Sequence, residues 1–284
     1  MSETLYENLT ITNSFIFGKV MQEPSLCKHF LEKLLGIKIQ KISYPEREKE
    51  IGIMPDGHDV RLDVYADDTE DSMFNVEMQA YMDRDIRKRS RYYQGVMDVN
   101  FLKKGMDYGE LPRSFVIFIC NYDVFGLDKP IYAFENRCVQ EDGLRLGDDA
   151  YRIFLCLTPH FADADIDEDI KAFLFYIKGI VKEDNQFIQR LDEELYNVKN
   201  NKLWRKEYMK YELDLMMMRR MGYEEGKEAA QEEINAMKEL QGATEKRAQD
   251  AEQKVSVLMG RLSELGYYVD PEKILENVAL VPCK

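Results

Sequence analysis

The chain has 284 residues, of which 45% are hydrophobic and 32% charged, and its formal net charge is −14. This balance is typical of a folded protein, and the acidity excludes a basic coat for nucleic acid over the whole surface. Three scattered histidines argue against a zinc enzyme, and five cysteines without a CxxC pair indicate free thiols. Without an apolar run of membrane-span length or a secretory signal, we expect a cytoplasmic protein with no membrane partner.

The first predicted element is a helix that begins after Ser14, the last of three consecutive capping residues, and runs to about Leu35. Pro24 is expected to break this helix, because proline has no N–H to donate inside a helix. Gly36 is expected to end it, since glycine tolerates the left-handed backbone that commonly closes helices.

The rest of the first 180 residues alternates between strand and helix patterns. Polar and apolar residues alternate over 59–65 and 73–79, and the run SFVIFIC at 114–120 is continuously apolar, as in a buried central strand. A helix is predicted from Arg84 to Lys104. Further strands are predicted over 38–45, 47–53, 131–139 and 151–157. This order predicts an α/β fold with a mixed sheet.

Charge and periodicity divide the chain into a domain over 1–180, a helical extension over 181–221 and a coiled-coil-like helical tail over 222–284. Over 234–265, a ladder of largely apolar residues recurs at alternating spacings of three and four, which is typical of a coiled-coil seam. We therefore expect a homo-oligomer through residues 234–265, formed by a short coiled coil or a helical hairpin. The alternative is a single amphipathic helix docked on its own domain.

The two alternating strands predict a hairpin that carries the candidate chemistry. If the hairpin folds about Glu70, facing residues have numbers that sum to 140, and Asp63 lies opposite Glu77 with Cβ atoms roughly 4.5–5.5 Å apart. Two carboxylates this close repel each other unless a cation lies between them, and Mg²⁺ or Mn²⁺ prefers such oxygen ligands. Gln79 shares the face of Glu77. The alternative is two half-exposed strands with polar outer faces.

The chain also resembles a known family over roughly its first 160 residues. The strings that carry the resemblance are FIFGKVM (15–21), LLGIKI (34–39), VRLDVY (60–65), NVEMQ (75–79), RSRYYQ (89–94), FVIFICNYD (115–123) and YAFENRC (132–138). Together they resemble the PD-(D/E)xK nuclease family transposases, also called recombination-promoting nucleases. The resemblance implies a restriction-endonuclease-like fold, which is a mixed sheet flanked by helices with the metal site at the edge of a strand hairpin.

The resemblance implies roles for individual residues. Asp63 would be the motif aspartate and a metal ligand, Glu77 the second ligand, and Mg²⁺ the cofactor, with Mn²⁺ as the alternative. Gln79 stands where the motif usually has lysine, so a dipole replaces a positive charge; many members of this transposase group are similar in this respect. Glu32 on the first helix is a candidate accessory acid. If an arginine filled the space between the two carboxylates, the nuclease prediction would fail, and only the similarity of fold to this family would remain.

A basic segment, RDIRKRSR at 84–91, follows the hairpin. On a helix, its side chains could neutralise DNA phosphates beside the hairpin, or alternatively pair with the acidic loop 66–71. The candidate contacts to the DNA backbone are Arg84, Arg87, Lys88, Arg89, Arg91 and Gln94. Nothing in the segment is typical of base reading, so we expect weak sequence preference.

These observations favour a metal-dependent DNA endonuclease linked to recombination or to a mobile element. A second hypothesis is a catalytically degenerate nuclease fold that acts as an interaction and assembly scaffold, which the missing lysine and the net acidity favour. A third hypothesis is a nuclease directed at RNA.

Overall fold

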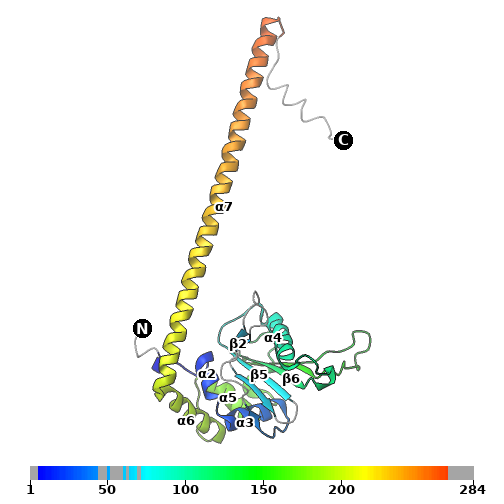
Figure 1. The fold of residues 1–284 in the computed structure, drawn as a ribbon, viewed down its shortest axis with the longest axis vertical. Coiled ribbons are helices and arrows are strands. Elements are labelled where there is room, and N and C mark those ends of the chain that lie inside the picture. The colour runs from blue at the N-terminus through cyan, green and yellow to red at the C-terminus, as the bar shows by residue number, and fades with distance from the viewer. Residues whose placement is uncertain (1–5, 44–49, 52–59, 62–63, 69–71, 268–284) are drawn as a thin grey trace. The chain divides into compact units, whose positions relative to one another are not determined.

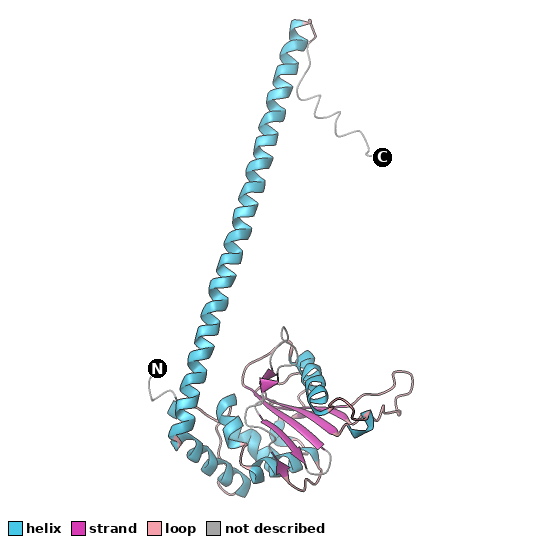
Figure 2. Ribbon diagram, viewed as in Figure 1, coloured by secondary structure: helices cyan, strands magenta, loops and turns pink. Residues whose placement is uncertain are grey.

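The structure is a computed structural model that describes residues 6–43, 50–51, 60–61, 64–68 and 72–267. In the described residues a six-stranded mixed sheet has the order β1-β4-β5-β6-β8-β7, and a separate pair joins β2 (Glu50–Ile51) to β3 (Val60–Arg61). The strands of the main sheet are β1 (Ile42–Ser43), β4 (Val64–Asp68), β5 (Ser72–Gln79), β6 (Arg113–Cys120), β7 (Ile131–Phe134) and β8 (Ala150–Cys156). This confirms the predicted α/β class (Figure 2).

Helices cover both faces of this sheet. Helix α4 lies on one side, and α2, α3 and α5 lie on the other (Figure 1). The helices are α2 (Ser14–Val20), α3 (Pro24–Leu35), α4 (Ile86–Phe101), α5 (Glu168–Ile177), α6 (Gln186–Asn200) and α7 (Lys202–Glu264). No helix in the described ranges combines the length and the apolar character needed to cross a bilayer.

The N-terminal helix pattern gives two helices, as predicted. The Asn13 side chain accepts a hydrogen bond from the Ile16 backbone N–H at 3.2 Å and so caps α2. Pro24 is the first residue of α3, where no intrahelical partner for an N–H is required. Gly36 ends α3 at a φ of 65°, the left-handed conformation that glycine adopts without strain.

The predicted register of the hairpin is confirmed over its described part. Strands β4 and β5 are antiparallel, and the pairs run from Val64 opposite Val76 to Asp68 opposite Ser72, so each pair sums to 140. Asp63, the predicted partner of Glu77, lies outside the described residues.

Strand β6 is the centre of the sheet. It pairs in parallel with β5 and with β8, and its residues from Ser114 to Cys120 are buried. This burial explains why SFVIFIC is continuously apolar and not alternating. Strand β7 pairs antiparallel to β8 and ends at Phe134, earlier than predicted, because the chain then enters a largely exposed loop.

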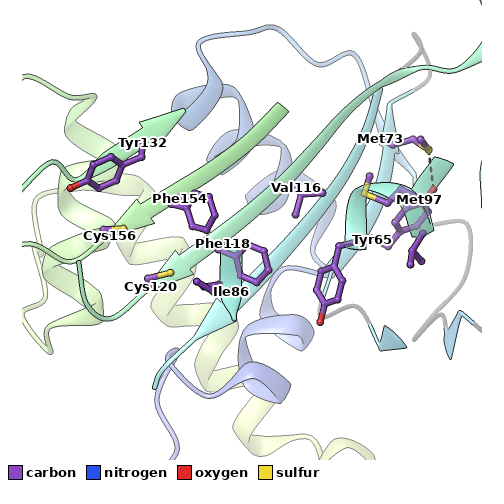
Figure 3. Packing of buried hydrophobic residues seen from close by; sticks show 12 residues of the cluster. Tyr65, Met73, Ile86, Met97, Val116, Phe118, Cys120, Tyr132, Phe154 and Cys156 are labelled. Atoms are coloured by element: carbon purple, nitrogen blue, oxygen red, sulfur yellow. Dashed lines mark hydrogen bonds between the residues drawn. The ribbon is translucent and has the colours of Figure 1, made fainter. Parts of the chain in front are cut away.

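The core between the sheet and α4 is aromatic. The Phe118 ring stacks on Tyr93 of α4 and on Phe154 of β8, with ring centroids 5.8 Å and 5.7 Å apart. Figure 3 shows Phe118 beside Phe154. Tyr65 and Met73 of the hairpin belong to the same buried cluster. The face of the hairpin that carries these two residues is therefore turned toward α4.

The first of two compact units includes α6 and the start of α7. Contacts divide the chain into Met1–Lys210 and Tyr211–Lys284. Helix α6 belongs to the first unit because its apolar stripe is buried against α2, α3 and α5. The start of α7 is also part of it, since Tyr208 packs on Tyr6 and Phe15 and Glu207 accepts a hydrogen bond from Lys19 at 2.8 Å.

Candidate active site

Glu77 lies on β5 directly beside Phe118 of β6. It is 4% exposed, and by strand alternation it faces α4 together with Met73 and Asn75. A carboxylate placed this deeply is costly unless cations or hydrogen-bond donors compensate its charge. The residue predicted as a metal ligand is thus a buried acid next to the aromatic core.

The guanidinium of Arg89 is the centre of the polar contacts around Glu77. It is carried by the first half of α4, and its planar face lies over the rings of Tyr93 and Phe118, with centroid distances of 5.3 Å and 5.4 Å. Its Nη2 atom donates to the Tyr93 hydroxyl at 3.0 Å. The same atom is 4.0 Å from Glu77 Oε2, an ion-pair distance that is too long for a hydrogen bond.

Arg89 makes its shortest contact with Asp83, where Nη1 and Oδ2 are 2.5 Å apart. Burial by itself would raise the pKa of Asp83, but hydrogen bonds from Arg89 and from the Asp85 backbone N–H outweigh it, so the pKa lies below its usual value. Burial by itself would lower the pKa of Arg89, but the contacts with Asp83, Tyr93 and Glu77 outweigh it, so the pKa lies above its usual value. The pair therefore stays charged.

Gln79 connects the strand to this arginine. Its Oε1 accepts from Arg89 Nη1 at 3.1 Å, and its Nε2 donates to the Tyr81 carbonyl at 3.0 Å. Both polar ends of the amide are thereby oriented. At the position where the motif usually has lysine, the chain holds a glutamine that accepts a hydrogen bond from a cation supplied by the neighbouring helix.

The six predicted DNA-contacting residues are not equivalent in the structure. Arg84, Lys88 and Arg91 have exposed side chains along α4 and its approach. Arg87 is also exposed, but it donates to the Val124 carbonyl at 2.9 Å and lies over the Phe125 ring. Arg89 belongs to the polar cluster described above.

Gln94 differs from the other five. It is 8% exposed, and its amide nitrogen donates to the Ser114 hydroxyl inside the sheet–helix core. This corrects the prediction that it contacts the DNA backbone, because a phosphate cannot reach a side chain enclosed between α4 and β6.

Glu32 does not fit the role of accessory acid. Its carboxylate accepts from the Ile39 backbone N–H at 2.9 Å and lies 3.9 Å from Lys28 on the same helix. Helix α3 packs on the side of the sheet away from α4, whereas Glu77 faces α4 (Figure 1). The carboxylate of Glu32 therefore fixes the end of α3 and does not join the cluster.

Comparison with family models places this arrangement in a known group. The model for PD-(D/E)XK nuclease family transposases matches residues 14–214. The chain belongs to this family. The match spans the sheet, α4 and the helices of the first compact unit, and it supports a nuclease-type function. Searches of curated proteins and of solved structures found no match.

In this member of the family, the chemistry of Glu77 suits the binding of a divalent cation. Glu77 offers a hard carboxylate oxygen in a buried position, which is the ligand that Mg²⁺ and Mn²⁺ prefer. Within the part of the chain that the structure describes, no three His, Cys, Asp or Glu side chains gather at one point. A metal site at Glu77 therefore requires Asp63, which lies outside the described residues, or oxygen atoms of water and substrate.

Sequence reasoning missed two polar residues of the site. Asp83 binds Arg89, and no strand or helix pattern marks it, since it lies in the connection between β5 and α4. Asn75 is fully buried on the same strand face as Glu77, and among the described residues neither polar atom of its amide has a hydrogen-bond partner. Strand alternation predicted that Asn75 shares a face with Glu77, but it gave no reason to expect a buried amide there.

Proposed function

We propose that this protein is a divalent-metal-dependent endonuclease that hydrolyses DNA phosphodiester bonds in recombination or transposition. Family membership supports a nuclease. The observation that carries the finer proposal is the convergence of a buried acid, an oriented amide and a charged guanidinium at Glu77, Gln79 and Arg89.

In this proposal Glu77 and Asp63 hold Mg²⁺, with Mn²⁺ as an alternative. When bound, such a cation neutralises phosphate charge and makes a water more acidic. Glu77 presents its carboxylate from strand β5, which is held between antiparallel β4 and parallel β6, so little reorganisation is needed to bind. Asp63 is assigned from the predicted pairing and the motif.

Arg89 replaces the charge of the usual motif lysine. A guanidinium near the scissile phosphate stabilises the negative charge that develops on its oxygens. Gln79 and Asp83 both accept from Nη1 of Arg89, while Nη2 donates to the Tyr93 hydroxyl, and these contacts hold the guanidinium beside the strand. Gln79 is thus a positioning residue for the cation.

The exposed cations of α4 provide the path for the DNA backbone. Lys88 and Arg91 lie on the same helix as Arg89, Arg84 lies just before that helix begins, and all three reach solvent. Contacts of this type go to phosphates and carry no base information, so we propose weak sequence preference. Because each phosphate contact releases counterions, binding should weaken steeply as salt is raised.

Plasmid cleavage tests the proposal. Purified protein and the Asp63→Ala and Glu77→Gln variants are incubated with supercoiled plasmid in Mg²⁺, Mn²⁺ or EDTA. Metal-dependent nicking by the parent that both variants lack supports the endonuclease. Equal traces in all three proteins indicate a contaminant and overturn it. Single-stranded RNA in a parallel reaction separates DNA from RNA as the substrate.

A second candidate function is an assembly scaffold with a degenerate site. The ion pair of Arg89 with Glu77 favours it, because a neighbouring guanidinium competes with a metal for the carboxylate. Calorimetric titration with Mn²⁺ distinguishes the two functions. Heat of binding that Glu77→Gln abolishes supports the enzyme, and the absence of both binding and nicking supports the scaffold.

We also propose self-association through residues 234–265. All of these residues are exposed or half-buried in the single chain, and α7 runs through them without a break up to Glu264. A helical hairpin, one of the predicted alternatives, is therefore excluded within 202–264. Size-exclusion chromatography with light scattering measures the mass of the full chain, and a monomer at all concentrations would overturn the proposal.

A further inference from the structure

Helix α7 has 63 residues, which corresponds to about 95 Å of length, and Tyr208 is its only buried residue. Beyond the first compact unit it has exposed apolar side chains, among them Ile234, Met237, Val255 and Leu258, which are 47% to 62% exposed. A long helix gains most of its stability from packing an apolar face and little from helix propensity. This part of α7 therefore has a face suited to a partner helix.

The face is a regular heptad seam that continues one residue past the helix. The a positions are Ile234, Gln241, Ala248, Val255 and Leu262, and the d positions are Met237, Thr244, Ala251, Leu258 and Leu265. Ile or Val at a combined with Leu at d is the pattern that favours two parallel strands. Val255 and Leu258 have this pattern. The polar residues Gln241 and Thr244 occupy the middle of the seam.

The charges beside the seam distinguish the orientations. In a parallel, in-register pair, each g residue lies beside the e residue five positions later in the other helix. This places Glu233 beside Lys238 and Arg247 beside Glu252 of a second copy, and symmetry repeats each pair. From 226 to 266, no such g–e pair joins like charges.

Other arrangements bring like charges together. A stagger of one heptad brings Glu233 beside Glu245 of the second copy and sets Gln241 against Ala248. An antiparallel pair with full overlap of the seam places Glu245 beside Glu252 and sets Gln241 against Leu258. Like charges at such positions are unfavourable, and a polar a residue prefers its own kind across the seam.

We infer that residues 234–265 bind the same segment of a second copy as a parallel, in-register two-stranded coiled coil. This deepens the proposed self-association and gives it an orientation. Because both chains enter the coil from the same end, two nuclease-like units are tethered there. Two such units could act on the two strands of one DNA or on two DNA sites.

Disulfide trapping tests the orientation in the full chain. Cysteine is introduced by Leu258→Cys at d, with Cys138→Ser and Cys283→Ser in the background, and oxidised glutathione is the oxidant. Each disulfide forms from two thiols as oxidised glutathione is reduced to two glutathione thiols. The matched control is Gln253→Cys, which lies on the opposite side of the same helix. We expect a covalent dimer for Leu258→Cys and none for Gln253→Cys.

Two other outcomes would overturn the inference. If Leu258→Cys is trapped only when it is mixed with Gln241→Cys, the helices are antiparallel and the inference is overturned. A monomeric mass for the untrapped protein overturns it as well. Neither result depends on cleavage of DNA, so the coil can fail while the nuclease proposal stands.

Charge reversal tests the register. Glu233→Lys with Arg247→Glu converts the attractive pairs into repulsive ones and should weaken dimerisation about tenfold or more. Adding Lys238→Glu and Glu252→Lys restores the pairs and should restore the dimer. The control, Glu232→Lys with Lys246→Glu, makes the same charge changes on the outer face. Equal weakening by control and test would contradict the register.

Discussion

In the proposed function, Arg89 supplies the positive charge that the motif lacks at position 79. Its guanidinium connects strand β5, the β5–α4 connection and α4 through contacts with Gln79, Asp83 and Tyr93. A planar fork with several donors can serve these partners at once, whereas an ammonium group is a compact point charge. Glutamine at position 79 is compatible with this arrangement because it can accept from the arginine.

Arg89→Met should reduce plasmid nicking by about 100-fold or more, since a positive charge at the phosphate is removed. It should also destabilise the fold by about 1–3 kcal/mol, because Asp83 loses its charged donor. Arg89→Lys should retain part of the rate. Nicking rates and urea unfolding curves measured on the same preparations check both effects. A parent-like rate for Arg89→Met would contradict the role.

Asp83 should make stability sensitive to acid. Its pKa is lower in the folded protein than in the unfolded chain, so the ionised form stabilises the fold above the unfolded value of about 4, and this contribution disappears as pH falls through the folded value. Asp83→Asn should therefore be less stable than the parent at pH 7, and the difference should shrink below about pH 4. Urea unfolding from pH 3 to 7 measures it; a constant difference would rule out the linkage.

At the scale of elements, the interface between the sheet and α4 combines an aromatic core with buried polar groups. Gln94 donates to Ser114, but its carbonyl oxygen and both polar atoms of Asn75 have no partner within the part of the chain that the structure describes. Buried polar groups without partners cost stability, and in natural proteins they often lie near functional sites. Asn75 lies two residues before Glu77 on the same face.

Asn75→Leu should stabilise the protein by about 1 kcal/mol, because an apolar group of similar size replaces an amide that the fold leaves without partners. If Asn75 serves the site, nicking should fall in the same variant while stability rises. The midpoint of urea unfolding and the nicking rate are the two readouts. A loss of stability would show that the amide makes hydrogen bonds in the folded protein.

At the scale of the whole molecule, the two units have different sources of stability. Met1–Lys210 has a sheet covered on both faces, whereas Tyr211–Lys284 contains a long helix whose described side chains are exposed or half-buried. The first unit can bury its own apolar surface, whereas in the proposed dimer the second unit buries its seam against another chain. The proposed catalysis and the proposed assembly therefore belong to different units.

Removal of residues 211–284 should leave a folded monomer. We expect the thermal midpoint to change by only a few degrees, because the contacts of Tyr208 and Glu207 with α2 and its approach are kept. Nicking should persist, while the ratio of double-strand breaks to nicks should fall. Light scattering and a plasmid time course check these outcomes. A truncated chain that remains a dimer would place the interface elsewhere.

The sequence by itself determined the features that depend on local pattern. Strand alternation predicted the hairpin register and the face of Glu77, Pro24 and Gly36 predicted the limits of α3, and the motifs predicted the family. The tertiary structure alone decided which polar residues meet. In sequence, Arg89 and Gln94 were candidate DNA contacts and Glu32 a candidate accessory acid, but packing of α4 on β6 buries Gln94, and the opposite layer holds Glu32. Side chains distant along the chain converge only when the layers pack, and local periodicity does not encode that contact.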